Sequence, residues 1–118
     1  MEELQINFIG VKDDGLAARH SGQNGMVAGN ALEALELFAM ALQMNRRYLP
    51  ASISVMTRIT DTGDSDMVKV PSGTGIRVIL DGNSMHDIKR ITDKIKSMAA
   101  GTALMAGCTA SIETINCF

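Results

Sequence analysis

Few side chains in this sequence are of the types that carry catalytic or metal-binding chemistry. The chain has two histidines, His20 and His86, and two cysteines, Cys108 and Cys117. A structural zinc site takes four Cys or His ligands at short spacings, and these residues show no CxxC or HxxxH pattern. No serine lies in a GxSxG turn, which presents the nucleophile of many hydrolases. We therefore expect no metal site and no nucleophile–base pair in this chain.

Composition narrows the classes of function further. The 118 residues suit one domain, and 46% are hydrophobic, enough for a packed core. A net charge of -2 and an aromatic content of 3% argue against a nucleic-acid surface, which needs basic and stacking side chains. No apolar stretch is long enough to span a membrane, and the first residues lack the pattern of a signal peptide. We expect a cytoplasmic protein with reduced thiols.

The elements that must position the chemical side chains follow from hydrophobic periodicity. Alternating apolar residues predict strands, and apolar residues three or four positions apart predict helices. Strands are expected at 4–11, 53–59, 75–80 and 109–115, and helices at 31–48 and from 85 to about 106. Asn30 and Ser84 are the predicted N-caps, and Gly107 is the predicted C-terminal stop. The glycine-rich segment 12–29 is expected to be a long loop.

The order strand, helix, strand, strand, helix, strand is typical of a ferredoxin-like, split β-α-β domain. We predict an α+β fold of one domain over residues 1–118, with both helices on one face of a four-stranded antiparallel sheet. Right-handed crossovers give the strand order 4-1-3-2. The second and fourth strands are then edge strands, and an unpaired edge is a template for pairing with another chain.

The first predicted helix carries more apolar surface than one core requires. Ala31, Leu35 and Phe38 form one stripe, and a second stripe lies beside it. The second stripe is either a wide core face or a surface for a partner, and we favour a homodimer through this helix and the second strand. The predicted interface residues are Leu37, Met40, Met44, Tyr48, Ile53 and Val55.

Several segments resemble one known module, the dimerisation (lid) domain of the di-zinc aminoacylase, amidohydrolase and carboxypeptidase metallopeptidases. Asn30-Ala31-Leu32 after a glycine-rich loop is similar to the Gly-x-Asn-Ala-Leu segment of that domain. The similarity extends to Ile6–Gly10, to Arg58–Gly63 and to Lys94–Ile112, which resembles the closing helix and strand. Together these segments spread over nearly the whole chain.

The resemblance implies a function for the parent enzyme and a role for one histidine. In that family a separate catalytic domain holds the zinc ions and the general base, and no such domain is present here. The lid contributes a histidine that stabilises the oxyanion in the partner's active site, which His20 matches by its spacing from Asn30. Asn30 and Arg77 are the candidate substrate-binding residues. For Arg77 the alternative is an ion pair with a cross-strand aspartate.

We therefore expect a dimerisation or lid domain of a zinc-dependent amidohydrolase or peptidase that acts on N-acyl amino acids or small peptides. The isolated chain is expected to be non-catalytic and to hold no cofactor, with zinc in the parent's catalytic domain. Its expected partners are a second copy and that catalytic domain, with no nucleic acid and no membrane. The alternative is a stand-alone regulatory module of the same fold that binds an amino-acid-like ligand at a dimer interface.

Overall fold

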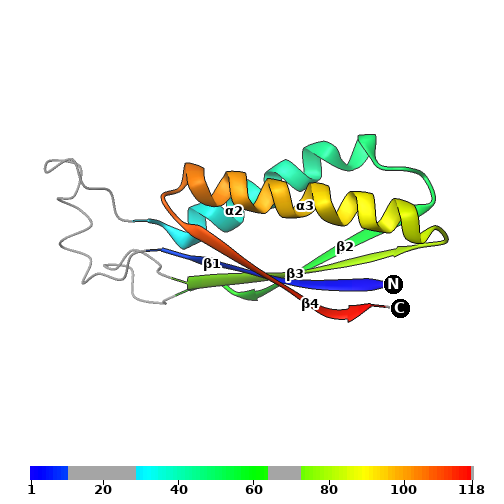
Figure 1. Cartoon of the computed structure of the whole chain (residues 1–118). Helices are drawn as coiled ribbons and strands as arrows, with labels where there is room; N and C mark the ends of the chain where they lie inside the picture. Colours follow the sequence, from blue (N-terminus) through cyan, green and yellow to red (C-terminus); the bar gives the residue numbers. More distant parts are fainter. Residues whose placement is uncertain (11–28, 64–72, 118) are drawn as a thin grey trace, which may run out of the picture.

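The computed structural model describes residues 1–10, 29–63 and 73–117. Its elements are β1 (Glu2–Ile9), α2 (Ala31–Asn45), the 3₁₀ helix η2 (Arg46–Tyr48), β2 (Ile53–Asp61), β3 (Gly73–Gly82), α3 (Met85–Met105) and β4 (Thr109–Cys117). The four strands form one sheet in the order β2-β3-β1-β4, and every neighbouring pair is antiparallel. Both helices cover the same face of this sheet (Figure 1). The predicted fold and strand order are confirmed.

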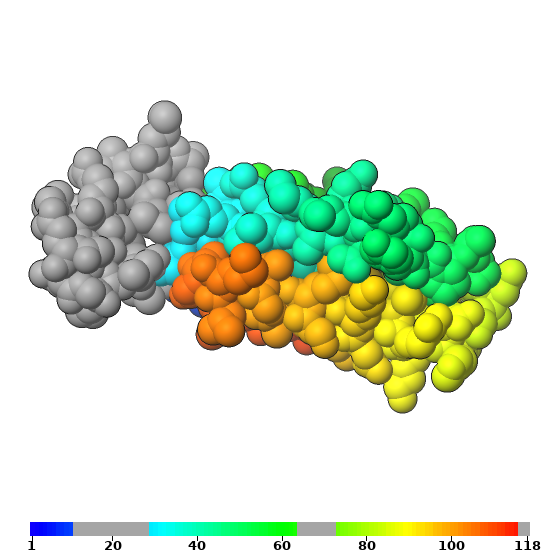
Figure 2. All heavy atoms as spheres, turned by 90° about the horizontal axis from the view of Figure 1, so that it is seen from above, coloured from blue at the N-terminus to red at the C-terminus, as the bar shows by residue number. Residues whose placement is uncertain are grey.

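The core lies between the helices and the covered face of the sheet. Leu4, Ile6 and Phe8 of β1 are completely buried, as the alternation of their strand predicts. The Phe8 ring meets the Phe38 ring of α2 at 5.9 Å between centroids, a separation at which tilted rings attract. The two helices lie side by side over this core (Figure 2). No described helix is both long and apolar enough to cross a membrane.

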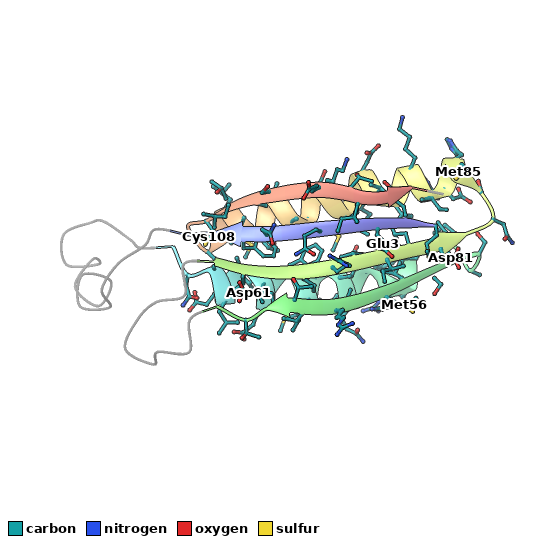
Figure 3. All side chains as sticks on the ribbon, turned by 90° about the horizontal axis from the view of Figure 1, so that it is seen from below. Glu3, Met56, Asp61, Asp81, Met85 and Cys108 are labelled. Atoms are coloured by element: carbon teal, nitrogen blue, oxygen red, sulfur yellow. The ribbon has the colours of Figure 1, made fainter. Side chains whose placement is uncertain are left out.

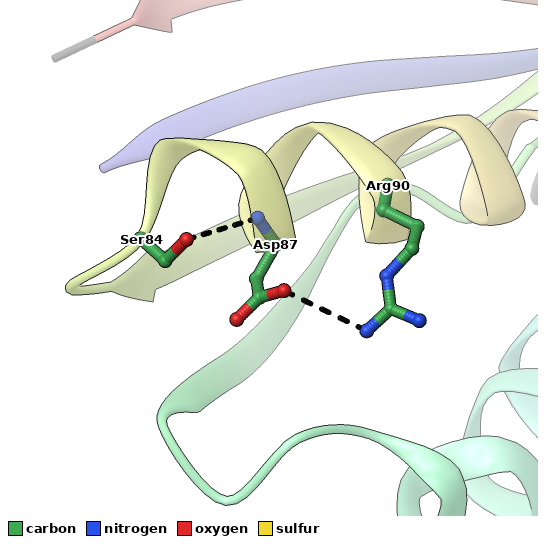
Figure 4. Close-up of polar contacts among 3 residues, drawn as sticks. All are labelled: Ser84, Asp87 and Arg90. Atoms are coloured by element: carbon green, nitrogen blue, oxygen red, sulfur yellow. Dashed lines mark hydrogen bonds and ion pairs between the residues drawn. The ribbon is translucent and has the colours of Figure 1, made fainter.

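Both helices begin at the predicted caps. The side chain of Asn30 accepts hydrogen bonds from the backbone N–H groups of Leu32 and Glu33, each at 3.1 Å. The Ser84 hydroxyl accepts a bond from the N–H of Asp87 at 3.3 Å, and the Asp87 carboxylate lies 3.7 Å from Arg90 (Figure 4). These side chains satisfy N–H groups that have no partner within the helix.

The predicted end of α3 is also confirmed. Gly107 directly follows the C-cap Ala106 and has a φ of +72°, the left-handed region that glycine enters without a steric penalty.

Some element boundaries differ from the predicted ones. The α-helix ends at Asn45 and not at Tyr48, because Pro50 forces Leu49 into an extended conformation, and the chain tightens into η2 beforehand. Strand β3 continues past its predicted end at Leu80 to Gly82, because Asp81 and Gly82 pair with Ser54 and Ile53 of β2. Strand β1 starts at Glu2 and ends at Ile9, and the predicted loop 12–29 falls outside the described residues except for Gly29.

Candidate functional site

Asn30 lies where three elements meet at the start of α2. Its side-chain oxygen is engaged by the cap, and its backbone N–H donates to the carbonyl of Ala106 at 3.1 Å. The buried Thr74 of β3 donates its hydroxyl to the Ala31 carbonyl at 2.7 Å. The structure thus gives Asn30 a positioning role at the junction of α2, α3 and β3. A ligand contact of Asn30 stays a prediction.

A close packing of glycines surrounds the Cys108 thiol beside this junction. A Cβ atom on Gly10 would lie 2.4 Å from the Gly29 carbonyl oxygen, and one on Gly29 would lie 2.3 Å from the Gly107 carbonyl oxygen. Both hypothetical atoms would also crowd the Cys108 sulfur, at 3.3 and 3.1 Å. Burial, followed by the negative charge of Glu33, raises the pKa of this thiol. Cys108 is therefore a protonated packing residue and not an activated nucleophile.

Arg77 lies on the face of the sheet that no helix covers, which we call the open face. Its Nε donates to the Gln5 side-chain oxygen at 3.3 Å, because Gln5 of β1 lies directly opposite in the register. The prediction that Arg77 pairs with a cross-strand aspartate is therefore wrong, because its cross-strand partner is Gln5. On its other side Arg77 faces Arg58 of β2, a residue that the sequence reasoning did not single out. Alternation along the second strand was the signal that could have found it.

A shallow hollow of about 450 Å³ surrounds these two arginines. It is lined by Glu3, Arg58, Ile59, Thr60, Arg77 and Ile79. Figure 3 looks onto this face and shows Glu3 on β1 and Met56 on β2. The hollow therefore crosses three neighbouring strands of the sheet.

The predicted dimer interface divides into exposed and buried residues. Met40 and Met44 are exposed on α2, and Leu37 is half-buried against the core. Ile53 and Val55 are only 8% and 7% exposed, because their side chains point under the helices. At the edge of the sheet these two residues therefore expose only their backbone groups. Met56 and Ile59 of the same strand have exposed apolar side chains.

Three basic side chains lie on or beside this surface. Tyr48 belongs to η2 and not to the α2 stripe, and its ring faces the charged groups of Arg47 and Lys94 at 5.6 and 6.0 Å. Arg46 Nη1 donates to the Val55 carbonyl at 2.7 Å. This bond engages one backbone acceptor of the edge strand. A second strand that paired along all of β2 would compete with it.

The histidines show no catalytic arrangement in the described part of the chain. His20 lies outside the described residues, and its predicted role stays a prediction. His86 is exposed in the first turn of α3. Among residues 1–10, 29–63 and 73–117, no group of three or more His, Cys, Asp or Glu side chains is placed to hold a metal ion. The described residues therefore offer no set of ligands for the zinc ions that the family resemblance implies for the parent enzyme.

The two ends of the described chain lie next to each other. Glu2 of β1 pairs with Cys117 of β4, and Figure 1 shows both termini at the same end of the sheet. Thr92 of α3 donates its hydroxyl to the Glu2 carboxylate at 2.9 Å, which fixes the start of β1 beneath the helix. Adjacent termini are the geometry of a domain that is inserted into a host chain by two neighbouring connections.

Known proteins resemble this chain in structure but not in sequence. No protein-family model and no curated protein sequence matches the chain. Solved structures do match over nearly its full length, at identities that establish the fold alone. The chain is similar to a hydantoinase/carbamoylase family amidase from Burkholderia ambifaria, with a TM-score of 0.77 and 13% identity over 98% of this chain. It spans 27% of that protein.

Two further neighbours agree with this likeness. An aminobenzoyl-glutamate utilization protein from Klebsiella pneumoniae has a TM-score of 0.75 and 17% identity, with 98% of this chain covering 28% of the other. A dinuclear metal-binding peptidase of the M20 family from Bacillus subtilis has a TM-score of 0.63 and 12% identity, with 97% covering 25%. The chain thus spans between a quarter and three tenths of these proteins. It has the fold of one part of amidase and peptidase structures.

Proposed function

We propose that this chain is the lid, or dimerisation, domain of a zinc-dependent amide hydrolase. The observation that carries the proposal is the shared fold over 97–98% of this chain and only 25–28% of the amidase and peptidase neighbours. A chain that matches larger proteins over nearly its own full length and about a quarter of theirs corresponds in fold to one part of them. The segments that resemble the family's lid domain support the same assignment.

The position of the termini supports an inserted module. Because Glu2 and Cys117 pair across β1 and β4, a host chain could enter and leave the domain at one point. The host would then supply the zinc ligands and the general base, and its reaction would be metal-assisted hydrolysis of an N-acyl or peptide amide bond. His20 would stabilise the oxyanion in the partner's active site, as the resemblance implies.

The proposed dimer joins two copies through β2 and α2. Strand β2 is an edge of the sheet, and its outer backbone groups could pair with those of a second copy. The neighbouring α2 exposes Met40 and Met44, which such a pairing would bury. Each Å² of apolar surface that the dimer buries would contribute about 25 cal/mol of favourable free energy to association. The bond from Arg46 to the Val55 carbonyl would have to shift or be shared.

The first test is the solution mass of the chain, measured by light scattering over a dilution series. We expect twice the chain mass of 12.6 kDa for the natural sequence. Met44→Glu should give the single-chain mass, because a charge would be buried in the interface. Met85→Glu is the matched control: Met85 is 56% exposed and Met44 is 57% exposed, but Met85 lies at the start of α3. This control should remain dimeric.

A single-chain mass at every concentration would contradict the dimer, and so would dissociation by Met85→Glu with no effect of Met44→Glu. The enzymatic part of the proposal has a separate check. The chain alone should hydrolyse no N-acyl amino acid and bind no stoichiometric zinc. Amidase activity of the isolated chain would overturn the assignment as a lid domain.

A further inference from the structure

In the described part of the chain two arginines lie directly opposite each other on the open face of the sheet, and neither forms an ion pair. Arg58 of β2 and Arg77 of β3 are direct partners in the antiparallel register. Like charges that lie directly opposite one another destabilise a strand pair. Within the described residues the Arg58 side chain has no hydrogen bond or ion pair, and the Arg77 side chain has only the bond to Gln5. This arrangement favours a bound anion that would offset the repulsion.

Arg77 is held in place by a polar network. The Gln5 side-chain oxygen accepts the bond from Arg77, and the Gln5 amide nitrogen donates to Asn7 at 3.1 Å and to Thr60 at 3.0 Å. The network runs over Gly75, where a Cβ atom would lie 2.7–2.9 Å from these three polar groups. The absent side chain thus leaves room for Gln5 to fix Arg77. The terminal guanidinium nitrogens of Arg77 stay available to a ligand.

The hollow around the arginines has a definite charge and an apolar wall. Arg58 and Arg77 contribute two positive charges and Glu3 contributes one negative charge, so that the lining carries a net charge of about +1. Ile79 lines the same hollow, and Met56 lies opposite Ile79 across the strands. A volume of about 450 Å³ falls in the range of small-molecule sites.

We propose that this hollow binds a small organic carboxylate. The planar guanidinium groups of Arg58 and Arg77 would each donate paired hydrogen bonds to the carboxylate, a geometry that arginine favours. The apolar part of the ligand would lie against Ile79 and Met56. A single negative charge matches the net charge of the hollow, whereas a phosphate dianion would be repelled by Glu3. The site belongs to one copy of the chain and does not depend on the proposed dimer.

The test is a titration of the ¹⁵N-labelled chain with hexanoate, followed through the Nε–Hε resonances of its arginines. We expect saturable shifts for Arg58 and Arg77, and none with hexan-1-ol, which has the same length and no charge. Arg58→Gln should weaken hexanoate binding by about tenfold or more, since it removes charge-assisted bonds. Arg90→Gln is the control, because Arg90 lies on α3 in the other layer and pairs with Asp87.

Arg58→Gln should not unfold the chain, because within the described residues the Arg58 side chain has no hydrogen bond or ion pair to lose. Without hexanoate its melting temperature should equal or exceed that of the natural sequence, since the like-charge pair is removed. Unsaturable shifts, unchanged binding by Arg58→Gln, or a lower melting temperature of that variant would each overturn the proposal. Tighter binding of inorganic phosphate than of hexanoate would overturn the carboxylate assignment.

Discussion

At the scale of single residues, glycines decide how closely the backbone segments approach at one end of the molecule. Gly10, Gly29 and Gly107 bring three backbone segments together around the Cys108 sulfur. A side chain at the first two positions would meet backbone carbonyl groups, which cannot rotate away as the tip of a flexible side chain can. Gly10 and Gly29 are therefore required by packing, whereas Gly107 is required by its φ of +72°.

Gly29→Ala should strongly destabilise the chain. Its Cβ would lie 2.3 Å from the Gly107 carbonyl oxygen, so the backbone must shift, at a cost of about 2 kcal/mol or more in the free energy of unfolding. Gly101→Ala is the matched control, because Gly101 is exposed within α3 and a Cβ there meets nothing within 4 Å. It should stabilise the chain by about 1 kcal/mol. Urea denaturation of both variants checks the contrast, and equal effects would contradict it.

At the scale of elements, helix caps could be predicted from neighbouring residues, whereas strand ends could not. Asn30 and Ser84 cap their helices as predicted, because a cap depends only on residues two or three positions away. The length of β3 was mispredicted, because its last two residues, Asp81 and Gly82, pair with Ser54 and Ile53 of β2. Strand ends depend on partners that are distant in the sequence, which a local pattern does not contain.

The cap of α2 gives a prediction at this scale. Asn30→Ala removes the acceptor for the N–H groups of Leu32 and Glu33 and should lower the free energy of unfolding by about 1 kcal/mol. Asn30→Asp keeps an acceptor at the same place and adds a charge that the helix N-terminus favours, so that its stability should stay close to that of the natural sequence. Chemical denaturation monitored by circular dichroism measures both. An Asn30→Ala variant of undiminished stability would contradict the role of the cap.

At the scale of the whole molecule, the sheet has two different faces and two free edges. The helices cover one face (Figure 1), and among the described residues the other face carries the arginine pair and its polar network. The two edge strands are β2, which carries the proposed dimer contact, and β4, which ends beside the start of β1. The proposed functions therefore use different parts of the same fold: an edge for a second copy, and the open face for a small anion.

The adjacent termini allow a circular permutant to be designed. We expect a chain whose original ends are joined by a short Gly/Ser linker, with new ends between Gly82 and Asn83, to fold with the natural circular dichroism spectrum. New ends between Arg77 and Val78 form the control, because they interrupt the central strand β3, and this permutant should not fold. If the first permutant failed to fold, the inserted-module geometry would be contradicted.

The sequence by itself determined the fold class, the strand order, the inward residues and the helix caps, because hydrophobic periodicity and capping act over a few residues. Only the tertiary structure decided that Arg77 meets Gln5 and Arg58, that Ile53 and Val55 are buried, and that Gly10 and Gly29 lie together. These relations depend on the register between strands and on the packing of distant segments. A shift of one residue in strand register would have turned the side chains of Arg58, Arg77, Ile53 and Val55 to the other face of the sheet.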